Sequence, residues 1–168
     1  MLKTLQSMEN RNWLILLFSI AAVCVGLDQW TKWIAEEHLT YARPVTVTSF
    51  FDFTLLYNKG AAFSFLSNAG GWQRYFFTTI SLVASIGISV WIVTLKGHQR
   101  LLAFGLAFVL GGAVGNLIDR ALYGQVVDFL SFHWNGSYFP AFNLADSAIT
   151  FGAGILIYDM IFNGQNDD

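Results

Sequence analysis

Five aspartates stand in or beside apolar stretches of this chain: Asp28, Asp119, Asp128, Asp146 and Asp159. An ionised carboxylate in the middle of a membrane helix costs roughly 2.5–3.5 kcal/mol on insertion scales, so such residues are candidates for function. Asp128 and Asp146 flank one short segment that can fold back and bring them together. Two carboxylates at one site do not both ionise readily, so one keeps a proton while the other acts as a base. Such a pair can activate a water and protonate a carbonyl oxygen or a leaving amine.

Both residues also have simpler structural interpretations. Asp128 could cap a turn in a loop. Asp146 could cap the start of a helix, where the helix dipole favours a negative charge. A helix that begins at Pro140 would place Asn143 and Asp146 on one face, three positions apart. The spacing alone does not decide which carboxylate carries the proton.

Three further groups of polar residues can support such a site. Asn116, Asp119 and Arg120 have the spacing of one helix face, either as a polar cap where a helix leaves the bilayer or as a hydrogen-bonding shelf. Asn58 stands in a turn that could close a hairpin or present an edge to an extended peptide. Asp28 precedes Lys32 by four positions, which favours an ion pair within one helix, and Asp159 suits a cap near the end of the last helix.

Composition points to the bilayer as the solvent of this chain. Only 12% of its 168 residues are charged, half the share of about 25% in typical soluble domains, and the mean hydropathy is +0.51. A net charge of −2 without a basic patch argues against nucleic acid as a partner. One cysteine and three scattered histidines give no metal-ligand spacing, so no metal site is expected.

The elements that must position these residues are four membrane-spanning helices in a single membrane domain, residues 1–168. About 20 apolar residues cross the hydrocarbon core. The predicted fold is therefore an all-α integral membrane protein with a small extracytoplasmic β-cradle at about 41–66, where β-branched and aromatic residues alternate in part. Lysines and arginines near the helix ends place both termini in the cytoplasm. The helices are predicted at about 13–33, 72–95, 101–119 and 140–162.

Five motifs in this order resemble those of lipoprotein signal peptidase (signal peptidase II), over nearly the whole chain. They are Asp28-Gln29 with Lys32, and residues 57–64, 111–120, 126–129 and 139–147. The resemblance implies a multi-pass aspartyl endopeptidase of the bacterial cytoplasmic (inner) membrane, with its active site at the outer face. Its substrate would be a diacylglyceryl-modified prolipoprotein, cut just before the lipidated cysteine.

The same resemblance assigns roles to individual residues. Asp128 and Asp146 would be the catalytic dyad. No cofactor would be needed, and the cyclic peptide globomycin would inhibit. The residues that would line or support the substrate site, or act as its structural polar partners, are Asn58, Asn116, Arg120, Asn143, Asp28 and Asp119.

Two other functions fit the same residues. Intramembrane acids also occur in small transporters and proton-relay subunits, although here they gather at one interface and no half of the chain is duplicated. A non-catalytic binder of lipidated peptides could use the same cradle. Ion flux would indicate the first function, and capture of substrate without product would indicate the second.

Overall fold

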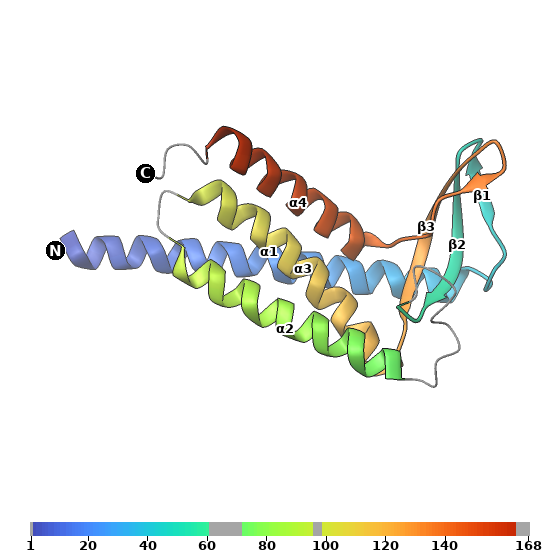
Figure 1. Cartoon of the computed structure of the whole chain (residues 1–168), viewed down its shortest axis with the longest axis horizontal. Coiled ribbons are helices and arrows are strands. Elements are labelled where there is room, and N and C mark those ends of the chain that lie inside the picture. Colours follow the sequence, from blue (N-terminus) through green and yellow to red (C-terminus); the bar gives the residue numbers. More distant parts are fainter. Residues whose placement is uncertain (1, 61–71, 96–98, 164–168) are drawn as a thin grey trace.

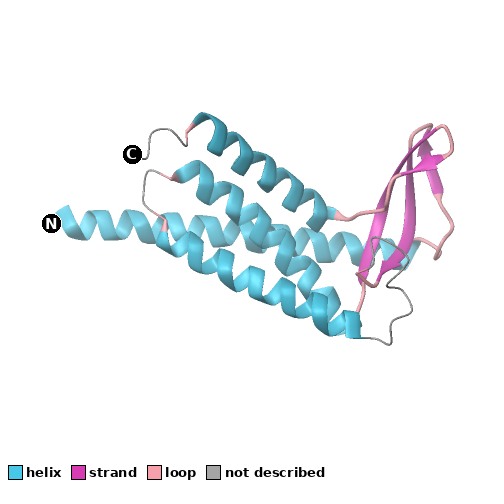
Figure 2. Ribbon diagram, in the orientation of Figure 1, coloured by secondary structure: helices cyan, strands magenta, loops and turns pink. Residues whose placement is uncertain are grey.

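A computed structural model describes residues 2–60, 72–95 and 99–163 of the chain. Four helices form a bundle, and a small sheet stands across one end of it (Figures 1 and 2). Each helix contains a stretch that is long and apolar enough to cross a membrane, as the sequence predicted. The helices are α1 (Leu2–His38), α2 (Trp72–Thr94), α3 (Arg100–Tyr123) and α4 (Leu144–Phe162).

Helix α3 packs against the other three helices and forms the centre of the bundle. Glycines on α3 permit this close packing because they present no side chain. A Cβ atom at Gly111 would lie 2.6 Å from the Cβ of Cys24 on α1, and one at Gly112 would collide with the carbonyl oxygen of Ala145 on α4. The backbones of α1 and α4, which carry buried polar residues, therefore lie in direct contact with the backbone of α3.

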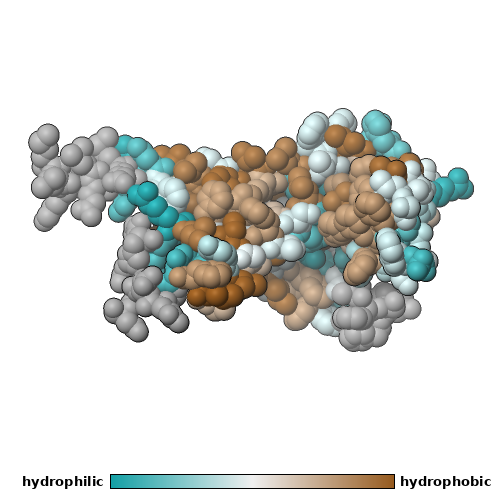
Figure 3. Space-filling view, turned by 90° about the horizontal axis from the view of Figure 1, so that it is seen from above, coloured by the Kyte–Doolittle hydropathy of each residue, from teal (hydrophilic) through white to brown (hydrophobic). Residues whose placement is uncertain are grey.

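The surface of the bundle is apolar along the helices, as a lipid-facing surface must be. Ile15, Val23, Val83 and Phe151 each expose more than half of their side chains. Figure 3 shows apolar residues over the middle of the molecule and hydrophilic residues nearer its ends. Soluble monomeric proteins rarely expose an apolar surface of this extent, so this surface suits contact with lipid.

The sheet contains four antiparallel strands in the order β1-β2-β3-β4. They are β1 (Val45–Thr48), β2 (Phe51–Asn58), β3 (Val126–Trp134) and β4 (Ser137–Tyr138). The predicted cradle at 41–66 contained only the first two strands, and its last part, residues 61–66, lies outside the described residues. The segment after α3, for which no strand was predicted, supplies β3. Its β-branched and aromatic residues suit a central strand, and β2 provides the partner.

Two local predictions need correction. Asp128 lies in strand β3 and not in a loop, with Leu56 of β2 opposite it. Helix α4 begins at Leu144, not at Pro140, because the Asn143 side chain accepts a hydrogen bond from the backbone N–H of Asp146 and so caps the helix. Asn143 is therefore the residue before the helix and does not share a helical face with Asp146.

Helices α1 and α3 also extend beyond their predicted ranges. Helix α1 continues past the apolar stretch to His38, and α3 continues past Asp119 to Tyr123. Gly124 ends α3 in the left-handed conformation, with φ of 75°, and its N–H bonds the carbonyl of Arg120. The start of α1 and the end of α4 lie together at the end of the bundle opposite the sheet (Figure 1).

Candidate active site

Asp128 is almost completely buried on β3, with 3% of its surface exposed. The Asn143 side-chain amide donates to its Oδ1 at 2.8 Å, and that of Asn58 donates to its Oδ2 at 3.1 Å. The orientation of Asn58 is fixed because its own Oδ1 accepts the N–H of Gly60 at 2.8 Å. Each oxygen of this carboxyl therefore has an amide donor in a defined direction.

Asp146 lies in the first turn of α4, where it forms a reciprocal cap with Asn143. The N–H of Asp146 donates to Asn143 Oδ1 at 2.9 Å, and the N–H of Asn143 donates to Asp146 Oδ2 at 3.3 Å. The other carboxylate oxygen, Oδ1, accepts from the side-chain amide of Asn116 on α3 at 2.8 Å. The predicted capping role of Asp146 is thus observed, yet one of its oxygens is also held by a second helix.

Asn143 brings the two aspartates to one point. It is 0% exposed, and it donates to Asp128 while it exchanges two hydrogen bonds with Asp146. The segment before α4 is held against β3, because the N–H groups of Phe129 and Leu130 both donate to the carbonyl of Phe142. Strand β3, which carries Asp128, and the start of α4, which carries Asp146, therefore lie next to each other.

The pKa of Asp128 reflects this position. Burial and then the negative charge of Asp146 raise the pKa of the Asp128 carboxyl from 3.8 to about 7, against the hydrogen bonds from Asn58 and Asn143, which lower it. A carboxyl with this pKa can keep its proton near neutral pH.

A buried ionic cluster lies beside the dyad. The Lys32 ammonium is 2.8 Å from Asp28 Oδ2, 2.8 Å from Asp119 Oδ2 and 3.0 Å from Asn116 Oδ1. An ammonium has three donors, and these contacts can use all of them. The ion pair predicted between Asp28 and Lys32 is present, but Lys32 also joins α1 to α3, which the i, i+4 spacing did not indicate.

The two aspartates of this cluster hold the backbone next to the dyad. Asp119 Oδ2 accepts the N–H of Val127, the residue before Asp128, at 3.2 Å. Asp28 Oδ1 accepts the N–H of Ala145, the residue before Asp146, at 2.9 Å. Each carboxyl of the candidate dyad thus follows a residue that a buried aspartate holds in place.

Gln29 completes the contact between α1 and α3, and the sequence analysis gave it no role. Its side-chain amide donates to Asp119 Oδ1 at 2.8 Å and to the carbonyl of Gly115 at 3.2 Å. The signal for both Gln29 and Lys32 was their place in an otherwise apolar helix, where each polar group needs a partner.

Arg120 lies on the same side of α3 as the dyad. Its guanidinium is near enough to Asp146, Asp128 and Asp119 for electrostatic attraction. It stands 6.0 Å from the ring centre of Phe77, and its buried Nε has no hydrogen-bond partner within the described part of the chain. Asp119 forms its ion pair with Lys32 of α1. Arg120 thus keeps one buried N–H that no described residue accepts.

A metal would need a different set of side chains. Among the described residues, no group of three His, Cys, Asp or Glu side chains could hold a metal ion. The donors around Asp128 and Asp146 are amides, which suit carboxyl groups and peptide carbonyls.

The sequence and the fold were compared with those of known proteins. Residues 20–162 match the model of the signal peptidase (SPase) II family. A lipoprotein signal peptidase from Acinetobacter baumannii is 50% identical over 154 residues, which cover 92% of this chain and 85% of that protein. One from a Janthinobacterium species is 56% identical over 142 residues, which cover 83% and 84%.

A solved structure described as a bacterial membrane enzyme agrees in fold. It superposes with a TM-score of 0.78 at 30% sequence identity, and the match covers 91% of this chain and 92% of that one. With the family match and relatives of about half identical sequence, the chain belongs to the signal peptidase II family.

Proposed function

We propose that this protein is an aspartic endopeptidase of the bacterial inner membrane that removes the signal peptide from diacylglyceryl-modified prolipoproteins, just before the lipidated cysteine. Its relatives are named lipoprotein signal peptidases. The observation that carries the proposal is the position of Asn143, which hydrogen-bonds Asp128 and Asp146 at once. Asp128 and Asp146 are the catalytic pair.

The two acids have different tasks. Asp128 holds the proton, because its pKa of about 7 keeps it protonated near neutral pH. Asp146 is the ionised partner and base, supported by the Asn116 amide and by the N-terminus of α4. A water between them loses a proton to Asp146 and attacks the scissile carbonyl carbon, while Asp128 protonates the carbonyl oxygen.

The intermediate then collapses with the same two groups. Asp146 gives its proton to the amide nitrogen as the carbon–nitrogen bond breaks. Asp128 takes a proton back from a hydroxyl of the intermediate as the new carboxylic acid forms. The amine leaves on the lipidated cysteine, and the pair returns to a single shared proton.

Neighbouring residues orient the acids and the substrate. Asn58 and Asn143 hold Asp128, and Asn116 holds Asp146. Arg120, which is electrostatically coupled to both acids, is the residue we assign to a carbonyl of the substrate backbone. Asp28 and Asp119 support the strand and helix that carry the dyad.

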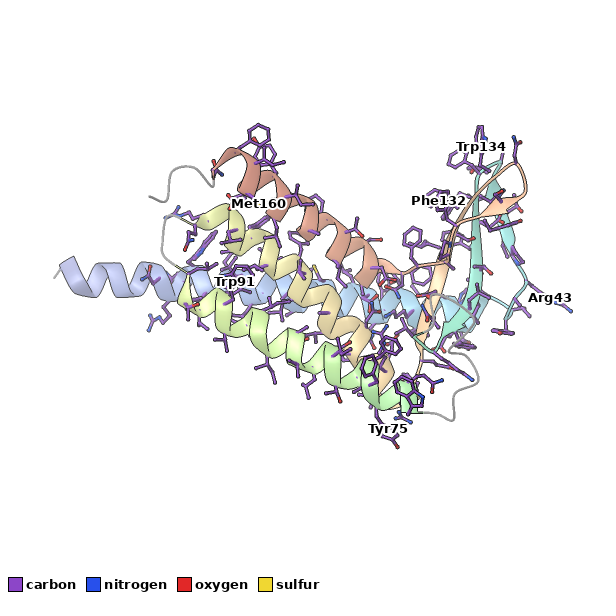
Figure 4. All side chains as sticks on the ribbon, in the orientation of Figure 1. Arg43, Tyr75, Trp91, Phe132, Trp134 and Met160 are labelled. Atoms are coloured by element: carbon purple, nitrogen blue, oxygen red, sulfur yellow. The ribbon has the colours of Figure 1, made fainter. Side chains whose placement is uncertain are left out.

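The site faces the outer side of the membrane in this proposal, and both termini are cytoplasmic. Lys3, Arg11 and Arg100 stand near the helix ends away from the sheet, which favours the cytoplasm for that end. The signal peptide and the acyl chains reach the dyad laterally from the bilayer. Phe132 of β3 projects on the side of the sheet that faces α4, whereas Arg43 points away from the bundle (Figure 4). Globomycin, which acts on this family, is expected to compete with substrate at the same site.

One incubation tests the proposed reaction. The purified protein is mixed with a synthetic precursor peptide that carries diacylglycerol on its cysteine, and both products are weighed by mass spectrometry. The proposal expects a free signal peptide and a product that begins with the lipidated cysteine. Binding without any product would favour a non-catalytic binder, and ion flux through liposomes without cleavage would favour a transporter.

A further inference from the structure

One face of α1 carries a stripe of residues that the dyad does not use. Cys24, Leu27, Thr31, Ile34 and His38 recur every three or four positions and so line one side of the helix. The stripe runs from the middle of the membrane span to the end of α1 beside the sheet. Two cavities lie along it, one after the other.

The inner cavity, of about 260 Å³, is lined by residues of α1, α3 and α4. Cys24 and Leu27 line it from α1, Phe108 from α3, and Ser147 and Phe151 from α4. The outer cavity, of about 320 Å³, lies one helical turn further along. Thr31 and His38 line it from α1, together with Phe53 and Phe129 of the sheet.

The walls of both cavities offer no free hydroxyl for water to bind. The Thr31 hydroxyl donates to the carbonyl of Leu27 at 2.8 Å, and the Ser147 hydroxyl donates to that of Asn143 at 3.0 Å. A buried water needs two to four polar partners, so an apolar cavity of this kind does not hold one. Within a bilayer, hydrocarbon is the occupant that fits such walls.

The cavities lie behind the dyad. Leu144, Ser147 and Phe151 share the face of α4 that lines the inner cavity, whereas Asp146 falls outside this face and bonds Asn116 on α3. Phe129 lines the outer cavity, and Asp128 precedes it on the strand, so their side chains leave opposite faces of the sheet. A molecule in these cavities is therefore separated from the two carboxyls by β3 and α4.

From these positions we infer that the stripe on α1 is a second, non-catalytic lipid site, in which an acyl chain of a resident bilayer phospholipid runs through both cavities. We assign a bilayer lipid and not the acyl chains of the substrate because the site lies behind the dyad. Trp30 and Trp33, exposed on α1 beside Thr31, mark the level where head groups meet hydrocarbon. The head group then lies near His38 and the chain descends past Leu27.

A lipid in this position would contribute to the packing of α1 against α4. Asp28 and Lys32 belong to the same turns of α1 as Leu27 and Thr31, and they hold α4 and Asn116. A chain in the cavities fills the space between α1 and α4 next to this ionic cluster, which the protein itself already buries. Charges in a dry surrounding interact more strongly than in water.

Photo-crosslinking in nanodiscs tests the lipid site. The full-length protein is reconstituted with phosphatidylglycerol that carries a diazirine on its acyl chain, irradiated, digested and mapped by mass spectrometry. We expect adducts on the α1 and α4 walls of the cavities, around Leu27 and Phe151, in excess over the lipid-facing side of α2. Ala148→Phe, which fills the inner cavity, should lower these adducts by about tenfold or more. Ala84→Phe, the same change on an exposed position of α2, should leave them unchanged.

Further experiments distinguish a bilayer lipid from the substrate as the source of the acyl chain, and test the lipid site separately from the proposed catalysis. Adducts that persist in excess diacylated precursor peptide support a resident lipid, and their displacement would assign the cavities to the substrate. Equal labelling of α2 and of the cavity walls would overturn the site. Leu27→Trp provides a second blocking variant if Ala148→Phe does not fold. Asp146→Asn should keep full labelling, so the lipid site and the catalytic proposal can fail independently.

Discussion

The ammonium of Lys32 lies 3.0 Å from Oδ1 of Asn116, and this contact decides which end of the Asn116 amide faces Asp146. The amide nitrogen of Asn116 is thereby left to donate to Asp146 Oδ1 at 2.8 Å. A flipped amide would turn its N–H groups toward the ammonium and its oxygen toward the carboxylate, two repulsive contacts. Lys32 is therefore a positioning residue that acts through Asn116.

Lys32→Met should lower kcat by about a hundredfold. The amide of Asn116 loses its fixed orientation, and Asp28 and Asp119 lose their cation. Removal of one partner of a buried pair typically costs about 3–5 kcal/mol, so the thermal unfolding midpoint should fall as well. Lys32→Arg, which keeps the charge, should recover part of both. A Met variant with the wild-type rate would show that Lys32 does not position the dyad.

Asn58→Leu should move the alkaline limb of the kcat/KM profile to higher pH. The hydrogen bond from Asn58 lowers the pKa of Asp128, so its loss raises that pKa further above 3.8. In the proposed mechanism Asp128 acts in its protonated form, so activity is expected to fall as pH rises through its pKa. Steady-state rates between pH 5 and 9, an interval of about two units on either side of the wild-type value, measure the shift. A limb that moved to lower pH would mean that Asp128 is not the acid.

Asp128 should also make the stability of the protein depend on pH. Its pKa is about 7 in the folded protein and 3.8 as the ordinary value, so between these pH values the unfolded chain has lost a proton that the folded protein keeps. The free energy of unfolding therefore falls as pH rises through this window. Asp128→Asn removes the effect.

Thermal unfolding of the two proteins at several pH values, in one detergent, isolates this contribution, because all other titrating groups are shared. We expect a loss of stability toward neutral pH that is steeper in the wild type than in Asp128→Asn. Parallel curves for the two proteins would show that Asp128 ionises in the folded state near its ordinary pKa.

Gly112→Ala should reduce activity by about tenfold or more, although it adds a single methyl group. A Cβ atom there would collide with the carbonyl oxygen of Ala145, so α4 must move and carry Asp146 out of position. Gly87→Ala on α2 is the matched control, since a Cβ at Gly87 has no other heavy atom within 4 Å. The control should keep its rate and gain a few tenths of a kcal/mol or more in stability. Equal activity of both variants would contradict the close packing of α3 and α4.

Much of the fold and of the candidate site could be predicted from the sequence, because polar residues within membrane helices are few and each needs a structural partner or a function. Four spans followed from hydropathy, and the proposal that Asp128 and Asp146 act together followed from their place on either side of one segment that can fold back. The third strand was missed because its residues come directly after a membrane helix, and its partner β2 stands far away in sequence. Long-range pairing of this kind leaves little local trace.

The supporting cluster was harder to predict for a similar reason. An i, i+4 spacing suggests an ion pair within α1, but it says nothing of a third partner on another helix. Only the packing of α1 against α3 shows that Lys32 also reaches Asp119 and Asn116. The start of α4 was misplaced because Pro140 suits a first helical turn, while the reciprocal cap formed by Asn143 and Asp146 decides the boundary.

The role of the two acids can be tested directly by the rate at which purified wild-type, Asp128→Asn and Asp146→Asn proteins release the signal peptide from the diacylated precursor. All three proteins should insert, fold and bind the precursor. The account predicts cleavage by the wild type and a loss of about a thousandfold or more in each variant, because neither acid can complete the proton transfers alone. Wild-type rates from either asparagine variant would contradict it.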